Sequence, residues 1–256
     1  MNSTLIDQKI EEKIYTNKEL SQLRRLPIPE HIAIIMDGNR RWAQKQGLPP
    51  IAGHWRGADN LSHIVKCCSE IGIKVLTVYA FSTENWKRSP FEVKALMRIF
   101  KSQLTRQKPV MQQEGIRLNV IGDVTKFPLD VQKSLNETIE ATKGGETLDL
   151  VIALNYGGRD EIRRAIQTII HDVQNEKVKS SHLTEEMISS YLDTAKWKDP
   201  DLLIRPSGES RLSNFLLWQI SYTEVLLTNT LWPDFNGKHL LNAIFEYQKR
   251  ELRLGK

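Results

Sequence analysis

Short apolar runs, each ending abruptly in polar residues, recur along this chain. Residues 32–36 (Ile-Ala-Ile-Ile-Met) stop at Asp37, as a buried parallel strand stops where it enters a loop. Similar runs follow at residues 75–81, 117–122, 148–155, 202–205 and 224–227. Helical periodicity separates several of them, notably over residues 90–114 and 159–173. This alternation predicts an α/β fold with a central, mostly parallel β-sheet flanked by helices on both faces.

The length of the chain fits a single domain of this kind. An α/β chain of 256 residues buries roughly 70% of its unfolded surface without dividing, and no repeat or long linker interrupts it. We expect the domain to cover residues 29–256, after an N-terminal helical extension over residues 1–28. Between Ser3 and Leu26, Ile6, Ile10 and Ile14 recur every four residues, which predicts an amphipathic helix. Such a helix would cap the domain or lie on a membrane surface.

Composition limits where the protein works. No apolar run approaches the roughly 20 residues that cross a bilayer, and charges at Asp7 and Lys9 occupy the place of a signal peptide's apolar core. We therefore expect a cytoplasmic protein with at most peripheral contact to a membrane. The two cysteines, Cys67 and Cys68, are adjacent, which disfavours a disulfide and predicts reduced, packed thiols.

Positive charge is concentrated after the first predicted strand. From Gly38 to Ala58 the chain has no acidic residue, and the window holds Arg40, Arg41, Lys45, His54 and Arg56. Its glycines and a predicted helix start near Asn39 would turn backbone N–H groups toward an anion, which indicates a phosphate or diphosphate site. Asp37, at the mouth of this window, would hold a divalent cation against that anion. Alternatively, Asp37 caps a helix beside solvated arginines.

Polar residues also follow other predicted strands, at the edge where open α/β sheets bind ligands. Residues 82–88 supply hydroxyls, an amide, an indole and two cations. Residues 205–214 place two arginines around a Pro/Gly turn, an arrangement suited to clamping a diphosphate, although paired arginines also suit salt bridges. The sequence contains no Walker, G-x-G-x-x-G, H-E-x-x-H or G-x-S-x-G motif.

Six ordered segments together resemble the cis-prenyltransferases, specifically the undecaprenyl diphosphate synthase family of bacteria. They are residues 31–43, 79–86, 155–159, 201–205, 213–219 and 231–235. The resemblance implies the cis-prenyltransferase fold with a hydrophobic tunnel. It further implies an isoprenyl transferase that adds isopentenyl diphosphate, in successive cis condensations, to an allylic diphosphate, usually farnesyl diphosphate, with Mg²⁺ as cofactor. The expected product is long-chain undecaprenyl diphosphate, the lipid carrier for cell-wall glycans.

The resemblance also implies roles for individual residues. Asp37 would hold Mg²⁺ and assist departure of the allylic diphosphate, and Asn85 would serve condensation and proton removal. Substrate-binding roles are implied for Gly38, Asn39, Arg40, Arg41, Trp42, His54, Ser82, Thr83, Glu84, Trp86, Arg88, Arg205, Arg211, Leu212 and Ser213. Glu224 would be a second metal ligand, and Arg253-Leu254-Gly255 would complete the site of the neighbouring subunit in a homodimer.

The product tail needs a dry tunnel, because apolar surface is stabilised when it is removed from water. Candidate lining residues are Leu96, Ile99, Phe100, Leu104, Leu148 and Ile152, although such a stripe also suits plain core. Two positions depart from the family: Pro50 replaces a common arginine, and Ser210 replaces a histidine found in some members. Arg40 is an additional cation that would compensate for Pro50.

Three alternatives remain open from the sequence. A medium- or short-chain cis-prenyltransferase would share every motif above. A non-catalytic partner subunit would lack residues such as Asp37 and Arg205, which this chain has. A sequence pI of about 9.1 also suits a nucleic-acid-binding protein, but the net charge of +5 is small for the length, and we expect no nucleic-acid partner. Release of a lipid product implies transient membrane contact.

Overall fold

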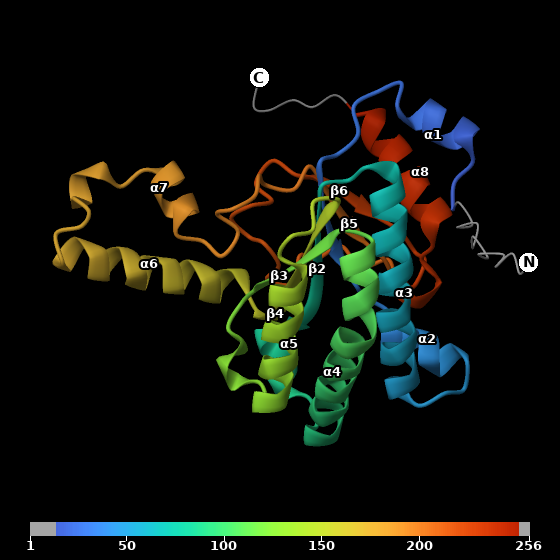
Figure 1. The fold of residues 1–256 in the computed structure, drawn as a ribbon, viewed down its shortest axis with the longest axis horizontal. Helices are drawn as coiled ribbons and strands as arrows, with labels where there is room; N and C mark the ends of the chain where they lie inside the picture. The colour runs from blue at the N-terminus through green and yellow to red at the C-terminus, as the bar shows by residue number, and fades with distance from the viewer. Residues whose placement is uncertain (1–13, 251–256) are drawn as a thin grey trace, which may run out of the picture.

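Six parallel strands form the central sheet of the domain (Figure 1). The computed structural model describes residues 14–250, and all statements of structure refer to them. The strands are β1 (His31–Ile35), β2 (Val75–Ser82), β3 (Ile116–Ile121), β4 (Leu148–Tyr156), β5 (Leu202–Arg205) and β6 (Glu224–Leu227). Their order is β3-β4-β2-β1-β5-β6, and every neighbouring pair is parallel. Each predicted strand is confirmed to within one residue at either end.

Helices connect these strands along the chain. The α-helices are α1 (Asn17–Leu23), α2 (Asn39–Lys45), α3 (Pro50–Ile71), α4 (Pro90–Gln113), α5 (Leu129–Thr142), α6 (Gly158–Gln174), α7 (Glu185–Ser190) and α8 (Gly237–Gln248). Short 3₁₀ turns are η1 (Thr83–Lys87), η2 (Val124–Lys126), η3 (Ser180–His182) and η4 (Trp232–Asp234). The two helices predicted from periodicity, α4 and α6, are confirmed.

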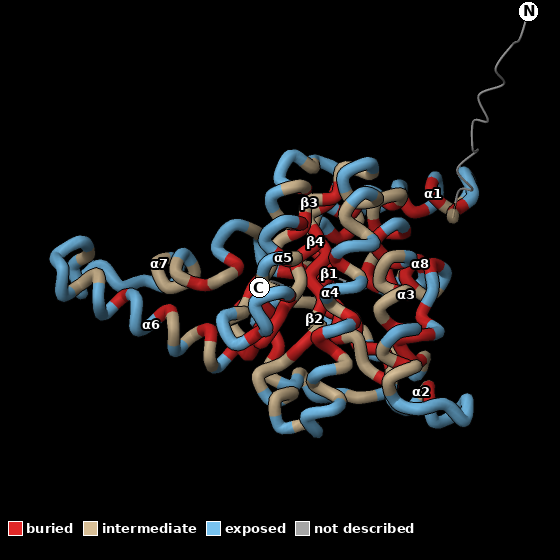
Figure 2. Tube along the Cα trace, turned by 60° about the horizontal axis from the view of Figure 1, so that its bottom comes forward, coloured by how far each residue is buried: buried red, intermediate tan, exposed pale blue. Residues whose placement is uncertain are grey.

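Two apolar cores lie on opposite faces of the sheet, because side chains alternate along a strand. Ile32 and Ile34 of β1 belong to the larger core, which α3, α4, α5 and α8 cover. Ala33 and Ile35 belong to the smaller core, whose other face is made mainly by Phe215 and nearby residues. Figure 2 shows the buried residues concentrated along the strands. In both views α6 and α7 project away from the rest of the domain (Figures 1 and 2).

The N-terminal helix differs from its prediction. Much of the predicted segment lies outside the described residues. Within them, the predicted continuous helix is wrong at Ile14 and Tyr15, where the chain bends before α1 begins. A capping box causes the late start: the Thr16 Oγ1 accepts from Glu19 N–H (3.2 Å), and the Glu19 carboxylate accepts from Thr16 N–H (2.8 Å). Tyr15 is buried and donates to the Gly237 carbonyl (2.9 Å), so this segment packs on the main core.

The cysteine prediction is confirmed. Cys67 and Cys68 are both free thiols and both buried in α3. Burial raises the pKa of Cys67 to about 11, so the thiol stays protonated at neutral pH. Within residues 14–250, the structure contains no helix with the length and apolar character needed to span a bilayer.

Candidate functional site

A polar pocket lies beyond the carboxyl ends of β1, β2 and β5, where the sequence placed the chemistry. It contains about 1170 Å³ of empty space that opens to solvent. Nine of the predicted site residues line it: Asp37, Asn39, His54, Ser82, Glu84, Asn85, Arg88, Arg205 and Ser213. The fold therefore gathers residues from four separate segments of the chain into one cavity.

Asp37 and Arg205 form the charged centre of this pocket. The Arg205 guanidinium is buried and donates to the Asp37 carboxylate (2.8 Å) and to the Ser213 hydroxyl (3.0 Å). Asp37 also accepts from Gly38 N–H (2.7 Å), and its side chain remains 30% exposed. Burial alone would raise the pKa of Asp37, but these donors and the nearby charge of Arg41 outweigh burial and lower the pKa. Asp37 is therefore a carboxylate at neutral pH and faces the pocket.

The predicted helix start at Asn39 is confirmed, and its geometry depends on Gly38. Gly38 caps α2 with a φ of 101°, a conformation that favours glycine, and a Cβ there would lie 2.9 Å from Leu231. Within the described residues, the backbone N–H groups of Asn39, Arg40 and Arg41 have no acceptor. Free N–H groups of this kind at a helix start can receive an anion.

Two glycines of the basic window have a different role from the one predicted. Gly53 and Gly57 lie inside α3, so they do not form a loop around an anion, and that interpretation is wrong. A Cβ on Gly53 would lie 2.0 Å from the Asn39 carbonyl oxygen, and a Cβ on Gly57 would lie 2.2 Å from the Asn39 Oδ1. These glycines allow α2 to pack directly against α3, which fixes the position of Asn39.

Glu92, which the sequence analysis missed, organises the cations at the pocket mouth. Its carboxylate accepts from Arg88 (2.9 Å), contacts the His54 Nε2 (3.3 Å) and lies 4.0 Å from Arg40. Burial, and then the charge of Arg88, lowers the pKa of His54, so His54 is neutral at pH 7. The spacing of Arg88 and Glu92, four residues apart at the start of a predicted helix, was the available signal. Pro50, the position where the chain departs from the family's common arginine, is the first residue of α3.

The loop after β2 holds its polar groups by local hydrogen bonds. The Asn85 Oδ1 accepts from Ser82 N–H (3.1 Å) and caps η1. The Glu84 carboxylate accepts from the Asn214 amide (3.1 Å). Burial raises the pKa of Glu84, but several hydrogen bonds outweigh it and lower the pKa. Asn214, also missed as a site residue, lines the pocket and joins this loop to the segment that carries Ser213.

Several predicted residues do not line the pocket. The Trp42 indole donates to Asp234 (2.8 Å), and the Trp86 indole donates to Asn155 (2.8 Å). Arg211 is 68% exposed and pairs with Glu209 (2.7 Å). The remaining members of this group are Gly38, Thr83, Leu212 and the two arginines Arg40 and Arg41, apart from Glu224, which is described below. Trp42, Trp86 and Arg211 therefore bind partners outside the cavity, although they adjoin residues that line it.

Glu224 is not near Asp37 within one chain. Glu224 begins β6 and is level with Ile32 through the registers of β5 and β1, whereas Asp37 lies five residues beyond Ile32. That offset alone separates them by about 16 Å along the strand direction. The Glu224 carboxylate instead pairs with Arg250 (2.5 Å). Within one chain the two carboxylates therefore lie at opposite edges of the sheet, and whether Glu224 ligates a metal stays a prediction.

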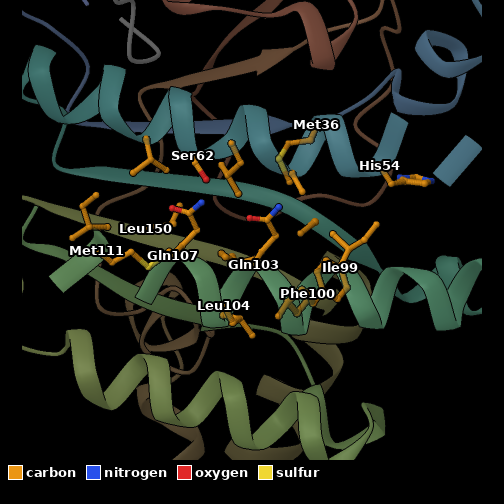
Figure 3. A pocket seen from close by; sticks show the side chains of 18 of the residues that line it. Met36, His54, Ser62, Ile99, Phe100, Gln103, Leu104, Gln107, Met111 and Leu150 are labelled. Atoms are coloured by element: carbon orange, nitrogen blue, oxygen red, sulfur yellow. The ribbon is translucent and has the colours of Figure 1, made fainter. Parts of the chain in front are cut away.

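An apolar tunnel continues from the polar pocket between α3, α4 and the sheet (Figure 3). It contains about 1050 Å³ of empty space, part of which is open to solvent. Both cavities are lined by Met36, Asn39, His54, Ala80 and Leu96, so they meet there. Of the predicted tunnel residues, Leu96, Ile99, Phe100, Leu104 and Ile152 line it. Leu148 does not line it and is buried within the main core.

Comparison with known proteins identifies similar sequences and structures. A family model described as "Putative undecaprenyl diphosphate synthase" matches residues 35–255. An isoprenyl transferase of Clostridium perfringens is 49% identical, with 89% of this chain and 90% of that protein covered, and one of Bacillus cereus is 47% identical, with 92% of each covered. A crystal structure of lavandulyl diphosphate synthase from Lavandula x intermedia, in complex with dimethylallyl diphosphate, matches with a TM-score of 0.87 and 36% identity over 90% of this chain and 99% of that chain. A probable undecaprenyl diphosphate synthase of Campylobacter jejuni matches with a TM-score of 0.75 and 32% identity over 90% of this chain and 100% of that chain.

Proposed function

Because the chain belongs to the undecaprenyl diphosphate synthase family and is a prenyl transferase, we propose that it extends farnesyl diphosphate by successive cis additions of isopentenyl diphosphate. The proposed product is a long-chain polyprenyl diphosphate, undecaprenyl diphosphate, for the carrier of cell-wall glycans. The observation that carries this proposal is the direct connection between a charged pocket and an apolar tunnel. A prenyl diphosphate has this same division between a charged head and an apolar tail.

We assign the allylic diphosphate to the start of α2. The free N–H groups of Asn39, Arg40 and Arg41 would donate to its oxygens, and Arg88 lines the same pocket. His54 is neutral and would donate one hydrogen bond without adding charge. These donors are fixed before the substrate arrives, so they would stabilise negative charge as the diphosphate leaves.

The residues present also fit Mg²⁺. The described residues contain no group of three or more His, Cys, Asp or Glu side chains that could enclose a metal. Mg²⁺ commonly binds through one or two carboxylates together with substrate phosphates and waters, and Asp37 supplies one ionised carboxylate at the pocket. When bound, Mg²⁺ would neutralise charge that develops on the leaving diphosphate.

Isopentenyl diphosphate would bind beside Arg205 and Ser213, which are already joined by a hydrogen bond. In the condensation, the allylic C–O bond breaks and its electron pair leaves with diphosphate, while the isopentenyl double bond forms the new C–C bond. A proton then passes to the departing diphosphate, and the electrons of the broken C–H bond form the new double bond. Asn85 would orient the isopentenyl group, because a neutral amide is a poor base. Its Oδ1 is committed to Ser82 N–H, which leaves the amide N–H groups to donate.

The depth of the tunnel favours a long product over a short one. The lining stripe runs along α4 from Leu96 to Glu114, the residue that follows the helix. Eighteen residues of helix rise about 27 Å, so the tunnel extends far beyond the polar pocket. A short-chain enzyme needs only the part near Leu96.

We also propose a cytoplasmic homodimer with transient membrane contact. The exposed Ile166 and Ile170 on α6, with fractional exposures of 48% and 51%, give it an apolar face that a second copy would cover. The proposed cross-subunit segment Arg253-Leu254-Gly255 lies outside the described residues.

The test is incubation of the purified protein with farnesyl diphosphate, labelled isopentenyl diphosphate and Mg²⁺, followed by sizing of the products. We expect long labelled products, their loss with EDTA, and loss of most activity in Asp37→Asn. The matched control is Asp234→Asn, which removes a carboxylate bonded to Trp42 outside the pocket and should keep activity. The absence of chain extension in the native protein, or extension unaffected by EDTA, would contradict the proposal.

A further inference from the structure

Asn155, near the end of β4, makes two side-chain hydrogen bonds in a buried position. Its side chain amide is shielded from water, since the residue is only 4% exposed. The Oδ1 accepts from the Trp86 indole N–H (2.8 Å), and the Nδ2 donates to the Asp123 carbonyl (2.6 Å). Because one partner is a donor and the other an acceptor, the direction of the amide is fixed. Asn155 lines neither cavity, so any effect on the reaction must pass through a partner.

A β-bulge places the Asn155 side chain. Phe81 pairs with Leu154 in the register of β2 and β4. The next residue, Ser82, pairs with Tyr156, so Asn155 is an extra residue in β4. Its φ of 45° is left-handed, a conformation that asparagine tolerates better than most residues. Bulges often redirect a side chain beside a functional site, and this one lies where β4 meets the loop after β2.

Trp86 belongs to that loop and lies between two residues that line the polar pocket, Asn85 and Arg88. Within the part of the chain that the structure describes, two side-chain hydrogen bonds join the loop to segments distant in the sequence. One, made by Glu84, is exposed. The other is the half-buried bond from Trp86 to Asn155. Asn155 therefore supplies the attachment of the loop that is shielded from water.

Asn155 also fixes the surroundings of the Trp86 ring. The ring packs edge-to-face on Phe81 and Phe127, with centroid separations of 5.1 and 5.8 Å. Phe127 ends the η2 turn, and Asp123, whose carbonyl accepts from Asn155, begins it. Edge-to-face contacts permit a range of ring positions, whereas a hydrogen bond requires one direction. A single amide thus sets the direction of the indole and holds the turn against which the indole packs.

We propose that Asn155 is a positioning residue for the condensation, which holds Asn85 and Arg88 at the pocket through its bond to Trp86. The inference rests on the proposed function. With the loop held in this way, Arg88 would meet the allylic diphosphate and Asn85 the isopentenyl group without a cost for ordering the loop. Loss of the bond would let both residues move away from the reacting groups, which lowers the rate.

The test is steady-state kinetics of the full chain and two variants with farnesyl diphosphate, labelled isopentenyl diphosphate and Mg²⁺. Asn155→Gly removes the amide and retains a residue that adopts the left-handed backbone, and Trp86→Phe removes the indole N–H and retains an aromatic ring. We expect each to lower kcat/KM by about tenfold or more and to raise the KM for farnesyl diphosphate, because Arg88 moves. A smaller folded fraction alone would lower the apparent kcat and leave KM unchanged.

The double variant, Asn155→Gly with Trp86→Phe, tests whether the two residues act through one bond. Losses from a shared bond do not multiply, so the double variant should remain within about threefold of the weaker single variant. Independent roles would multiply the two losses, to about 100-fold or more.

Trp197→Phe is the matched control. The Trp197 indole donates to the Asp149 carboxylate over the same 2.8 Å, in a half-buried position, and Trp197 lines neither cavity. This variant should keep native kinetics. An unchanged KM for farnesyl diphosphate in Asn155→Gly, or multiplied losses in the double variant, would overturn the inference. If Asn155→Gly does not fold, Trp86→Phe decides, and kinetics equal to those of Trp197→Phe would overturn it. A native protein that incorporates no label refutes the proposed function instead, which is a different result.

Discussion

Replacing Gly53 with alanine tests whether the packing of α2 against α3 positions the proposed diphosphate site. The new Cβ would lie 2.0 Å from the Asn39 carbonyl oxygen and 2.8 Å from its carbonyl carbon. Ordinary contact begins near 3.4 Å, so the two groups must separate by about 1.4 Å. Backbone atoms cannot rotate aside, and therefore α2 itself has to move, together with the residues that follow Asp37.

The expected loss of stability is small, and the expected loss of activity is large. Overpacking costs about 1–3 kcal/mol, while alanine in a helix interior returns about 1 kcal/mol relative to glycine. The free energy of unfolding should therefore fall by about 0–2 kcal/mol, which corresponds to a decrease in Tm of up to about 8 °C. A displacement of about 1 Å in a catalytic group can lower the rate about 100-fold.

The assay pairs a thermal melt with the rate of labelled isopentenyl incorporation. Gly144→Ala is the matched control, because a Cβ there meets no atom within 4 Å, and it should keep full activity. A Gly53→Ala protein that folds and retains activity within about threefold of native would refute the reasoning that a 1 Å shift of α2 is costly.

Two further predictions concern charges at the site. Arg205→Met leaves Asp37 without its main partner and should lower the free energy of unfolding by about 1–3 kcal/mol, a range that is discounted for the exposure of Asp37. Arg211→Met should change the free energy of unfolding by less than about 1 kcal/mol, because its ion pair is exposed. Thermal melts of the two variants measure both changes, and equal losses would contradict the prediction. Because the folded state lowers the pKa of His54, the unfolded chain binds a proton first as the pH falls below about 6.5, so stability decreases there. His54→Gln should reduce that decrease in melts at pH 7.5 and 5.5, and an unchanged pH dependence would count against it.

Most of the fold could be predicted from the sequence. Strands buried on both faces appear as apolar runs with sharp ends, so their bounds and the edge that carries the site could both be inferred. The capped start of α1 could not be inferred from the isoleucine spacing, because the Thr16–Glu19 hydrogen bonds decided it. The wider site was found for the same reason as the strands: Asp37 and Asn85 follow β1 and β2, and Arg205 ends β5, and these three strands are neighbours in the sheet.

Side-chain direction was the part that the sequence left open. Trp42 and Arg211 adjoin residues that line the pocket, but each binds an acceptor elsewhere. Trp42 donates to Asp234, which is distant in the sequence, and Arg211 pairs with Glu209 in the turn beside it. The distance of Glu224 from Asp37 could not be inferred from the sequence, since only the register of β6 shows that Glu224 lies at the amino edge of the sheet.

The acid-free window is not an uncompensated positive patch in the folded protein. Carboxylates from other segments pair with its arginines: Glu92 lies beside Arg40, and Glu209 lies 3.5 Å from Arg41. Such pairing weakens the long-range field that would attract an extended polyanion and holds the guanidinium groups in place. A compact diphosphate that enters the pocket can still reach the free N–H groups of α2 and exchange with these carboxylates. The charge arrangement therefore favours short-range recognition of a small anion over attraction of a large one.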